Sequence, residues 1–135
     1  MPLDHFCITV PQGKLEDIAK FLTIALAPTG FKEIMRVGPN VIGFGEDKPY
    51  FWIWTSEAEE GQEESSMGLL KKSHIAFTAE NAEQVRQFHT AALEAGASCN
   101  GPLGLRKYHP GYYAAFVHDP VLGINFEVVC HSGDS

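Results

Sequence analysis

The stretch HIAFT at positions 74–78 nearly repeats HFCIT at positions 5–9. Each copy begins with a histidine and ends with a threonine, and bulky apolar residues stand at its second and fourth positions. Side chains of a strand alternate between its two faces, so each histidine shares a face with the threonine four residues later. We therefore predict two equivalent strands that cover a helix with one face and turn a histidine toward an enclosed space with the other.

The same order of elements follows each copy. After the first, a helical pattern covers 15–27, and strand patterns occupy 31–37, 41–45 and 50–55. After the second strand, at 72–79, Asn81 caps a helix that ends before Gly96, and strand patterns follow at 97–102, 112–118 and 124–130. The apolar stripes of the two helices include Ile24 and Leu93. The sequence thus predicts an α+β fold in which two tandem βαβββ modules, with four strands each, form an open cup.

The chain of 135 residues has the length of one domain. We place the first module at 3–55, an acidic connector rich in serine and glycine at 56–70, and the second module at 71–131. Together they make a single domain over 1–135.

The charge excludes some partners. With a formal net charge of −7 and no basic stripe, the chain is not expected to bind nucleic acid or an anionic membrane. The N-terminal stretch lacks a basic region followed by an apolar one, so we expect a cytoplasmic protein. Three widely spaced cysteines without a C-x-x-C pair fit reduced thiols.

One carboxylate lies in an otherwise apolar strand. In NFEVVCH (125–131), Glu127 shares a face with Asn125 and Val129, which is the face that the histidines occupy in their own strands. A carboxylate without a partner is costly to bury, and a metal ion would remove that cost. His5, His74 and Glu127 are therefore the predicted ligands of a divalent ion in the cup, which could be Fe, Mn, Zn, Ni or Co.

The chain resembles the vicinal oxygen chelate superfamily, which includes glyoxalase I, extradiol dioxygenases and the fosfomycin- and bleomycin-resistance proteins. The resemblance lies in LDHFCITV (3–10), SHIAFTAENAEQVRQFHTAALEAG (73–96) and HPGYYAAFVHDPVLGINFEVVCH (109–131). It implies two βαβββ modules around a divalent ion. It also implies that the first-strand histidines map onto His5 and His74, and the last-strand glutamate onto Glu127.

The sequence departs from glyoxalase I at one ligand. Alignment of YFWIWTS (50–56) with NFEVVCH puts Trp52 opposite Glu127, so the fourth ligand is missing and lactoylglutathione lyase activity is disfavoured. Trp52 and Trp54 either form an aromatic wall for an apolar or planar ligand or fill the interface between the modules. The loop at 104–113 supplies further candidates for substrate binding, which are Arg106, His109 and Tyr112.

Two functions stay open. The first is a metal-dependent enzyme of the lyase, isomerase or dioxygenase type, in which the ion chelates adjacent oxygens of a small-molecule substrate. The second is a metal-free protein that sequesters a small molecule, as in bleomycin resistance. The resemblance implies that the modules close either within one chain or between two chains. We expect a homodimer in which His5 of one chain meets His74 and Glu127 of the other.

Overall fold

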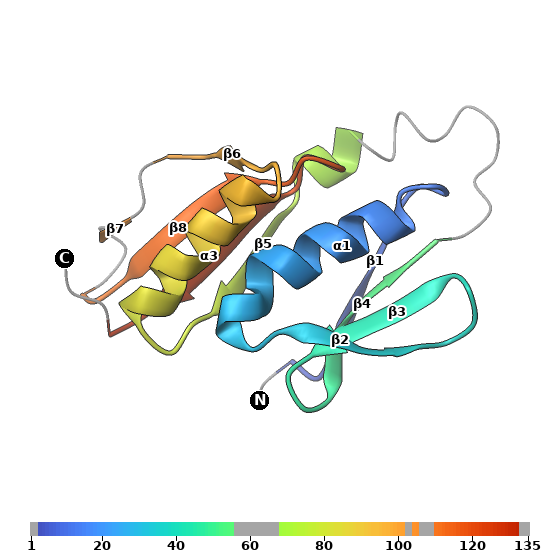
Figure 1. Ribbon diagram of the computed structural model, residues 1–135, viewed down its shortest axis with the longest axis horizontal. Coiled ribbons are helices and arrows are strands. Elements are labelled where there is room, and N and C mark those ends of the chain that lie inside the picture. The colour runs from blue at the N-terminus through green and yellow to red at the C-terminus, as the bar shows by residue number, and fades with distance from the viewer. Residues whose placement is uncertain (1–2, 56–67, 102–103, 106–109, 133–135) are drawn as a thin grey trace.

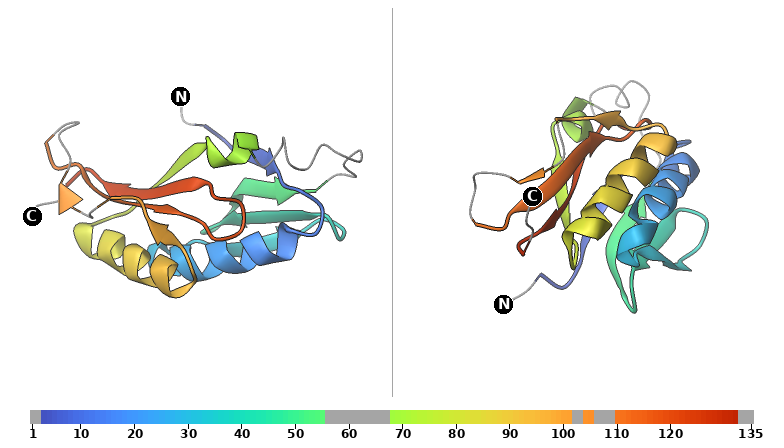
Figure 2. Two further views of the ribbon diagram at one scale, coloured as in Figure 1. Left: turned by 90° about the horizontal axis from the view of Figure 1, so that it is seen from above. Right: turned by 60° about the vertical axis from the view of Figure 1, so that its left-hand side comes forward.

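The computed structural model describes residues 3–55, 68–101, 104–105 and 110–132. Its two long helices, at 15–26 and 82–94, lie on one side of two sheets and form a second layer (Figures 1 and 2). None of the helices in these ranges has the length and apolar character needed to cross a membrane.

The first sheet has the strand order β1-β4-β3-β2. The elements of this half are β1 (Phe6–Thr9), α1 (Leu15–Leu26), the 3₁₀ turn η1 (Ala27–Thr29), β2 (Lys32–Arg36), β3 (Val41–Gly45) and β4 (Pro49–Trp54). β1 runs parallel to β4, and the other neighbours are antiparallel. Gly30 follows η1 with φ 88°, which lets the chain turn from the helix into β2.

The second sheet repeats this plan with the order β5-β9-β8-β6. Its elements are β5 (His74–Thr78), α3 (Ala82–Glu94), β6 (Ser98–Cys99), β7 (Gly104–Leu105), β8 (Tyr113–His118) and β9 (Asn125–Cys130). Asn81 caps α3 as predicted, because its side chain accepts from the backbone N–H of Gln84. The predicted α+β fold with two repeated units is therefore confirmed, with the order βαβββ in the first half and one additional short strand in the second.

The structure corrects the prediction in three places. The second sheet has five strands and not four, because β7 pairs with β8 beside the main path. Residues 68–71 form a helical turn where the prediction had a connector and the start of a module. Ile24 and Leu93 are exposed, at 41% and 39%, since the buried stripes run through neighbouring helical positions instead.

The core lies between the helices and the sheets and is shared by both halves. Phe77 of β5 packs against Phe31 and Phe51 of the first half, at ring-centroid distances of 5.2 and 5.5 Å. Phe21 of α1 lies 6.2 Å from Phe126 of β9. These contacts join the two halves into one hydrophobic core on the helix side.

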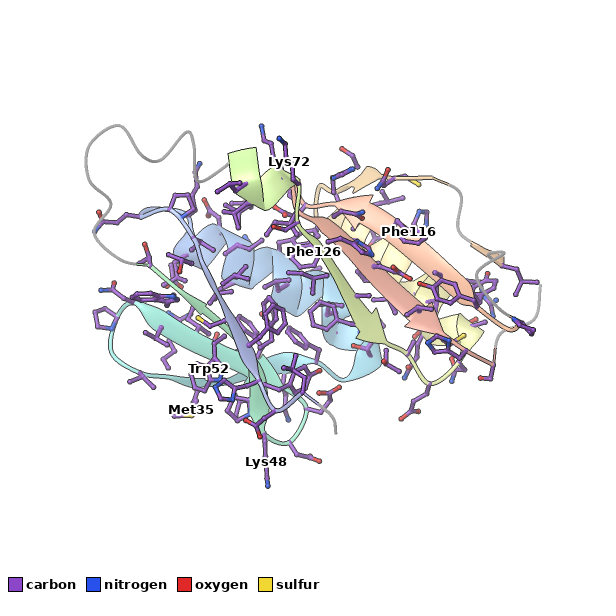
Figure 3. All side chains as sticks on the ribbon, turned by 180° about the vertical axis from the view of Figure 1, so that it is seen from behind. Met35, Lys48, Trp52, Lys72, Phe116 and Phe126 are labelled. Atoms are coloured by element: carbon purple, nitrogen blue, oxygen red, sulfur yellow. The ribbon has the colours of Figure 1, made fainter. Side chains whose placement is uncertain are left out.

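Neither α1 nor α3 lies on the other side of the two sheets, which we call the open face (Figure 3). In β1 and β5 the bulky residues pack on the core, whereas Cys7, Thr9, His74, Ala76 and Thr78 are exposed. The alternation predicted from HFCIT and HIAFT is therefore confirmed. A slip of one residue would have reversed every one of these side chains.

Candidate functional site

His74 and Glu127 meet on the open face of the second sheet. In the parallel pair β5–β9, His74 is in register with Asn125 and Ala76 with Glu127. The imidazole Nε2 lies 2.9 Å from Glu127 Oε1. The Phe116 ring of β8 stacks against the imidazole, with a centroid distance of 5.9 Å and an interplanar angle of 23°. Two of the three predicted ligands are thus neighbours.

The backbone fixes the orientation of the His74 ring. Its Nδ1 lies 3.2 Å from the carbonyl oxygen of Asn125, and a carbonyl only accepts, so Nδ1 carries a proton. Nε2 then faces a carboxylate oxygen, which also accepts. A hydrogen bond at this contact therefore requires a proton on one of the two groups.

Glu127 is buried, with only 2% of its surface exposed. One carboxylate oxygen contacts His74, and the other accepts a hydrogen bond from the Tyr112 hydroxyl. The sequence suggested that a metal ion would remove the cost of burying this carboxylate, and the two contacts offset that cost within the chain itself. The protein already supplies a partner for each oxygen, which is how buried polar groups are usually satisfied.

His5 lies apart from this pair. It immediately precedes β1, and 58% of its side-chain surface is exposed beside Asp4. Across the described ranges, which include His5, His74 and Glu127, no three histidine, cysteine or acidic residues form a group able to hold a metal ion. A single chain therefore brings together two of the three predicted ligands and not the third.

His5 instead borders an open cavity of about 490 Å³ on the first sheet. Its other lining residues are Cys7, Val41, Pro49, Trp52 and Trp54. Burial raises the pKa of the Cys7 thiol, although its side chain still reaches solvent, so the group stays protonated near neutral pH. The cavity is consequently apolar apart from the imidazole.

The two tryptophans lie on the open face and not between the modules. Trp54 is 39% exposed. Trp52 is in register with Cys7 and Gly43, just as Glu127 is with Ala76 and Phe116. Trp52 thus occupies the position equivalent to Glu127, as the sequence alignment predicted.

Gly43 explains how Trp52 is held. A methyl group at Gly43 would lie 2.7–2.9 Å from three carbons of the indole six-membered ring, so the ring lies against bare backbone. Sequence reasoning missed this contact. The glycine within VIGFG (41–45) was the available signal, since glycine in a strand often marks a close approach.

The other predicted residues divide into two groups. Arg106 and His109 lie outside the described residues. Tyr112, predicted to receive substrate, is described, and its hydroxyl contacts Glu127. Its role in substrate binding stays a prediction.

The remaining histidines have no direct contact with the pair among the interactions described. His89 contacts Cys99 Sγ at 3.3 Å, and His118 Nδ1 lies 3.1 Å from the carbonyl oxygen of Gly123. His131 is exposed and packs its ring edge-on against Tyr112, with centroids 5.3 Å apart.

A second cavity, of about 570 Å³, lies on the helix side. Lys14, Phe21, Glu94 and Pro120 are among its lining residues. It contains none of the predicted ligands and mixes both signs of charge. We therefore place the candidate site on the open face, which carries the His74–Glu127 pair on the second sheet and the cavity at His5, Trp52 and Trp54 on the first.

The chain matches no family model and no curated protein. Among solved structures, a putative glyoxalase from Bacillus halodurans is similar over 95% of this chain and 94% of its own, with TM-score 0.71 and 23% identity. A glyoxalase/bleomycin resistance protein from Albidiferax ferrireducens T118 has TM-score 0.65 and 23% identity, over 92% of this chain and 95% of its own.

A mutant of the fosfomycin resistance protein of Listeria monocytogenes, in complex with Mn(II) and 1S,2S-dihydroxypropylphosphonic acid, has TM-score 0.63 and 20% identity. The similarity covers 98% of this chain and 90% of that protein. At these sequence identities the similarity shows that the folds are alike and nothing about activity. The protein described here has the fold of the vicinal oxygen chelate superfamily.

Proposed function

We propose that the protein is a metal-dependent enzyme that binds a divalent ion at His74 and Glu127 and uses it to chelate adjacent oxygens of a small molecule. The contact between His74 Nε2 and Glu127 Oε1, with Nδ1 directed at a backbone carbonyl, carries this proposal. Histidines that bind metals usually donate their second ring N–H to such an acceptor, which keeps the other nitrogen free for the ion.

The donor set fits a divalent ion. An imidazole nitrogen and a carboxylate oxygen are ligands that divalent ions such as zinc take in proteins. His74 Nε2 and Glu127 Oε1 lie 2.9 Å apart, so both would be available to one ion. An ion at this position would take the place of the hydrogen bond between the two groups.

A second chain would complete the ligand set. His5 lies on the first module, outside the His74–Glu127 pair of its own chain. In a twofold dimer, the first module of one chain faces the second module of its partner, and His5 then becomes the third ligand. Closed twofold symmetry would form two equivalent sites and cover both open faces.

A bound divalent ion supplies Lewis acidity, which stabilises negative charge that develops on substrate oxygens. The residues of the chain then orient the substrate: Trp52 and Trp54 offer an apolar surface next to His5. Ring-opening dioxygenation, isomerisation and thiol addition are all compatible with this arrangement. The ligand of the fosfomycin resistance protein carries two adjacent hydroxyl groups, which supports a substrate with vicinal oxygens.

A metal-free binding protein is the second candidate. Glu127 already has a partner for each oxygen, and the cavity at Trp52 and Trp54 is mostly apolar. A protein that only sequesters an apolar molecule needs no more than this.

Metal analysis separates the two candidates. The untagged protein is purified without chelator, and its metal content is measured together with its molecular mass in solution. The enzyme proposal predicts a dimer with nearly stoichiometric metal, and a strong loss of metal in Glu127→Gln, which keeps the side-chain shape. A wild-type protein that neither retains metal nor takes it up on reconstitution supports the binding protein.

A further inference from the structure

Tyr112 contacts the carboxylate oxygen of Glu127 that His74 does not contact. Its hydroxyl donates to Glu127 Oε2, whereas His74 Nε2 lies at Oε1. Tyr112 immediately precedes β8, at the end of the loop that leads into this strand. The tyrosine therefore reaches a buried carboxylate from a loop and not from the sheet itself.

Two neighbours fix the position of Tyr112. The His131 ring packs edge-on against the tyrosine ring, with centroids 5.3 Å apart. Gly111 has φ 78°, and a methyl group added to it would lie 2.4 Å from the carbonyl oxygen of His131. Only glycine allows this backbone to approach the end of β9 so closely. The chain thus uses Gly111 and His131 to place the hydroxyl on the carboxylate.

We propose that Tyr112 is a positioning residue for Glu127: its hydroxyl holds one carboxylate oxygen so that the other is presented beside His74 to a divalent cation. This inference rests on the proposed function. A carboxylate whose second oxygen is engaged binds a cation through one oxygen only, in a fixed direction. Groups that orient ligands in this way typically change metal affinity 10- to 100-fold when removed.

The neighbouring tyrosine provides a matched control. Tyr113 is buried on the helix side, and its hydroxyl lies 3.5 Å from Arg86 Nη1. Tyr112→Phe and Tyr113→Phe therefore remove the same atom from adjacent residues on opposite sides of the sheet. Only the first removes a hydrogen bond to Glu127.

The contact itself is tested without metal. In the metal-free protein, Tyr112→Phe leaves a buried carboxylate oxygen without its donor and lowers Tm by about 3–10 °C. The same substitution in a Glu127→Leu protein has little effect, because the acceptor is gone. Equal shifts in Tm from Tyr112→Phe in the two backgrounds would overturn the proposal.

The positioning role is tested by titration with Co(II) alone, whose absorption spectrum reports the number of ligands. Tyr112→Phe is expected to bind Co(II) about 10- to 100-fold more weakly, with an altered spectrum, because Glu127 is free to rotate. Gly111→Ala displaces the tyrosine and has the same effect, after its fold is checked by circular dichroism. Tyr113→Phe binds within about two-fold of wild type.

The outcomes separate the two proposals. Wild-type affinity and spectrum in Tyr112→Phe overturn the positioning role and leave the metal proposal intact. A wild-type protein that binds no Co(II) overturns both the proposed function and the positioning role. Coupling between Tyr112 and Glu127 in the Tm measurements would then show a structural hydrogen bond only.

Discussion

The open faces of the two half-sheets share one backbone plan and carry different chemistry. The register that pairs Ala76 with Glu127 in the second sheet pairs Cys7 with Trp52 in the first. The next strand contributes Phe116 beside the carboxylate and Gly43 beside the indole. Both helix-side faces stay apolar, because each must cover a helix. The open faces have no such requirement, so one has become a polar site and the other an aromatic surface.

The largest expected effect tests whether the open face of the second sheet, with His74 and Glu127, holds the metal. Alanine at His74 or Glu127 is expected to weaken metal binding by more than about 100-fold, since even groups that only orient ligands contribute 10- to 100-fold. Alanine at His5 is expected to do the same if the first module supplies the third ligand. The measurement is metal content after dialysis against a defined free-metal buffer.

Histidines outside the site serve as controls. His118→Ala and His89→Ala should retain wild-type metal, because these side chains contact Gly123 and Cys99 instead. Equal metal content in all five alanine variants would show that the ligands are wrongly assigned.

The turn between the last two strands offers a second comparison. In the second module Asp119 is buried and accepts from the backbone N–H groups of Val121, Leu122 and Ile124. Asp119→Ala leaves these donors without their acceptor and is expected to cost about 3 kcal/mol in the free energy of unfolding. Asp47 is exposed in the corresponding turn of the first module. The free energy of unfolding of Asp47→Ala, measured by urea denaturation, should stay within about 0.5 kcal/mol of wild type. Similar losses of stability in both variants would refute this difference between the two turns.

The aromatic surface of the first sheet is tested at Gly43. Gly43→Ala forces the Trp52 ring away from the strand and is expected to cost about 1–3 kcal/mol, measured by chemical denaturation with tryptophan fluorescence. The cost should nearly vanish in a Trp52→Ala protein. Gly68→Ala is the control, since no atom lies within 4 Å of a methyl group there. If Gly43→Ala destabilises the Trp52→Ala protein as much as it destabilises wild type, the need for glycine comes from the strand backbone and not from the indole ring.

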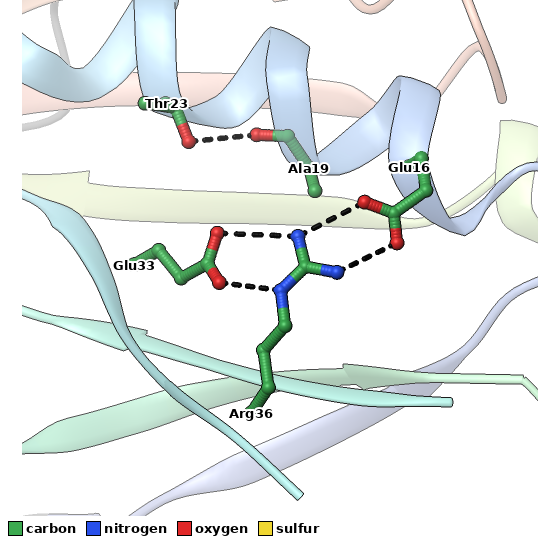
Figure 4. A network of polar contacts seen from close by, with 5 residues as sticks. All are labelled: Glu16, Ala19, Thr23, Glu33 and Arg36. Carbon is green, nitrogen blue, oxygen red and sulfur yellow. Dashed lines mark hydrogen bonds and ion pairs between the residues drawn. The ribbon is translucent and has the colours of Figure 1, made fainter. Parts of the chain in front are cut away.

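The smallest effect concerns an ion-pair network that is present in the first module (Figure 4). Arg36 of β2 binds Glu16 of α1 through two hydrogen bonds of 2.8 and 2.9 Å, and these bonds lower the pKa of Glu16. Because the pKa of Glu16 is lower in the folded state, its carboxylate adds stability at pH values above its ordinary pKa of 4.5. This stability is lost as the pH falls through the pKa of the folded state.

Because Glu16 is largely exposed, Glu16→Gln should cost at most about 0.5 kcal/mol at pH 7 and nothing at pH 2. Asp17→Asn, which removes a charge from the next residue of the same helical turn, is the control. Thermal unfolding at both pH values measures the difference, and a cost that persists at pH 2 would assign the effect to packing.

Much of the fold could be predicted because the relevant signals are local. Alternation within HFCIT and HIAFT assigns each side chain to a face, and Asn81 and Gly96 mark the ends of a helix. The same alternation put Glu127 on the face of His74. Their contact needed only the parallel pairing of β5 with β9.

The rest depends on contacts between distant segments. β7 is two residues long and exists through its pairing with β8, which no periodic pattern predicts. The hydrogen bond from Tyr112 to Glu127 follows from how closely Gly111 approaches His131, and the separation of His5 from His74 follows from how the two modules pack. Such distances are set by packing and not by strand periodicity.

The central claim is that a metal site combines His5 of one chain with His74 and Glu127 of another. The most direct test unfolds a His5→Ala chain and a Glu127→Ala chain, refolds them together and isolates the heterodimer by two different tags without histidines. Each parent homodimer lacks a ligand in both sites, whereas the heterodimer has one site without either ligand and one intact site. The account predicts that the heterodimer regains about half of the wild-type metal content. A verified heterodimer that binds no more metal than its parents would contradict it.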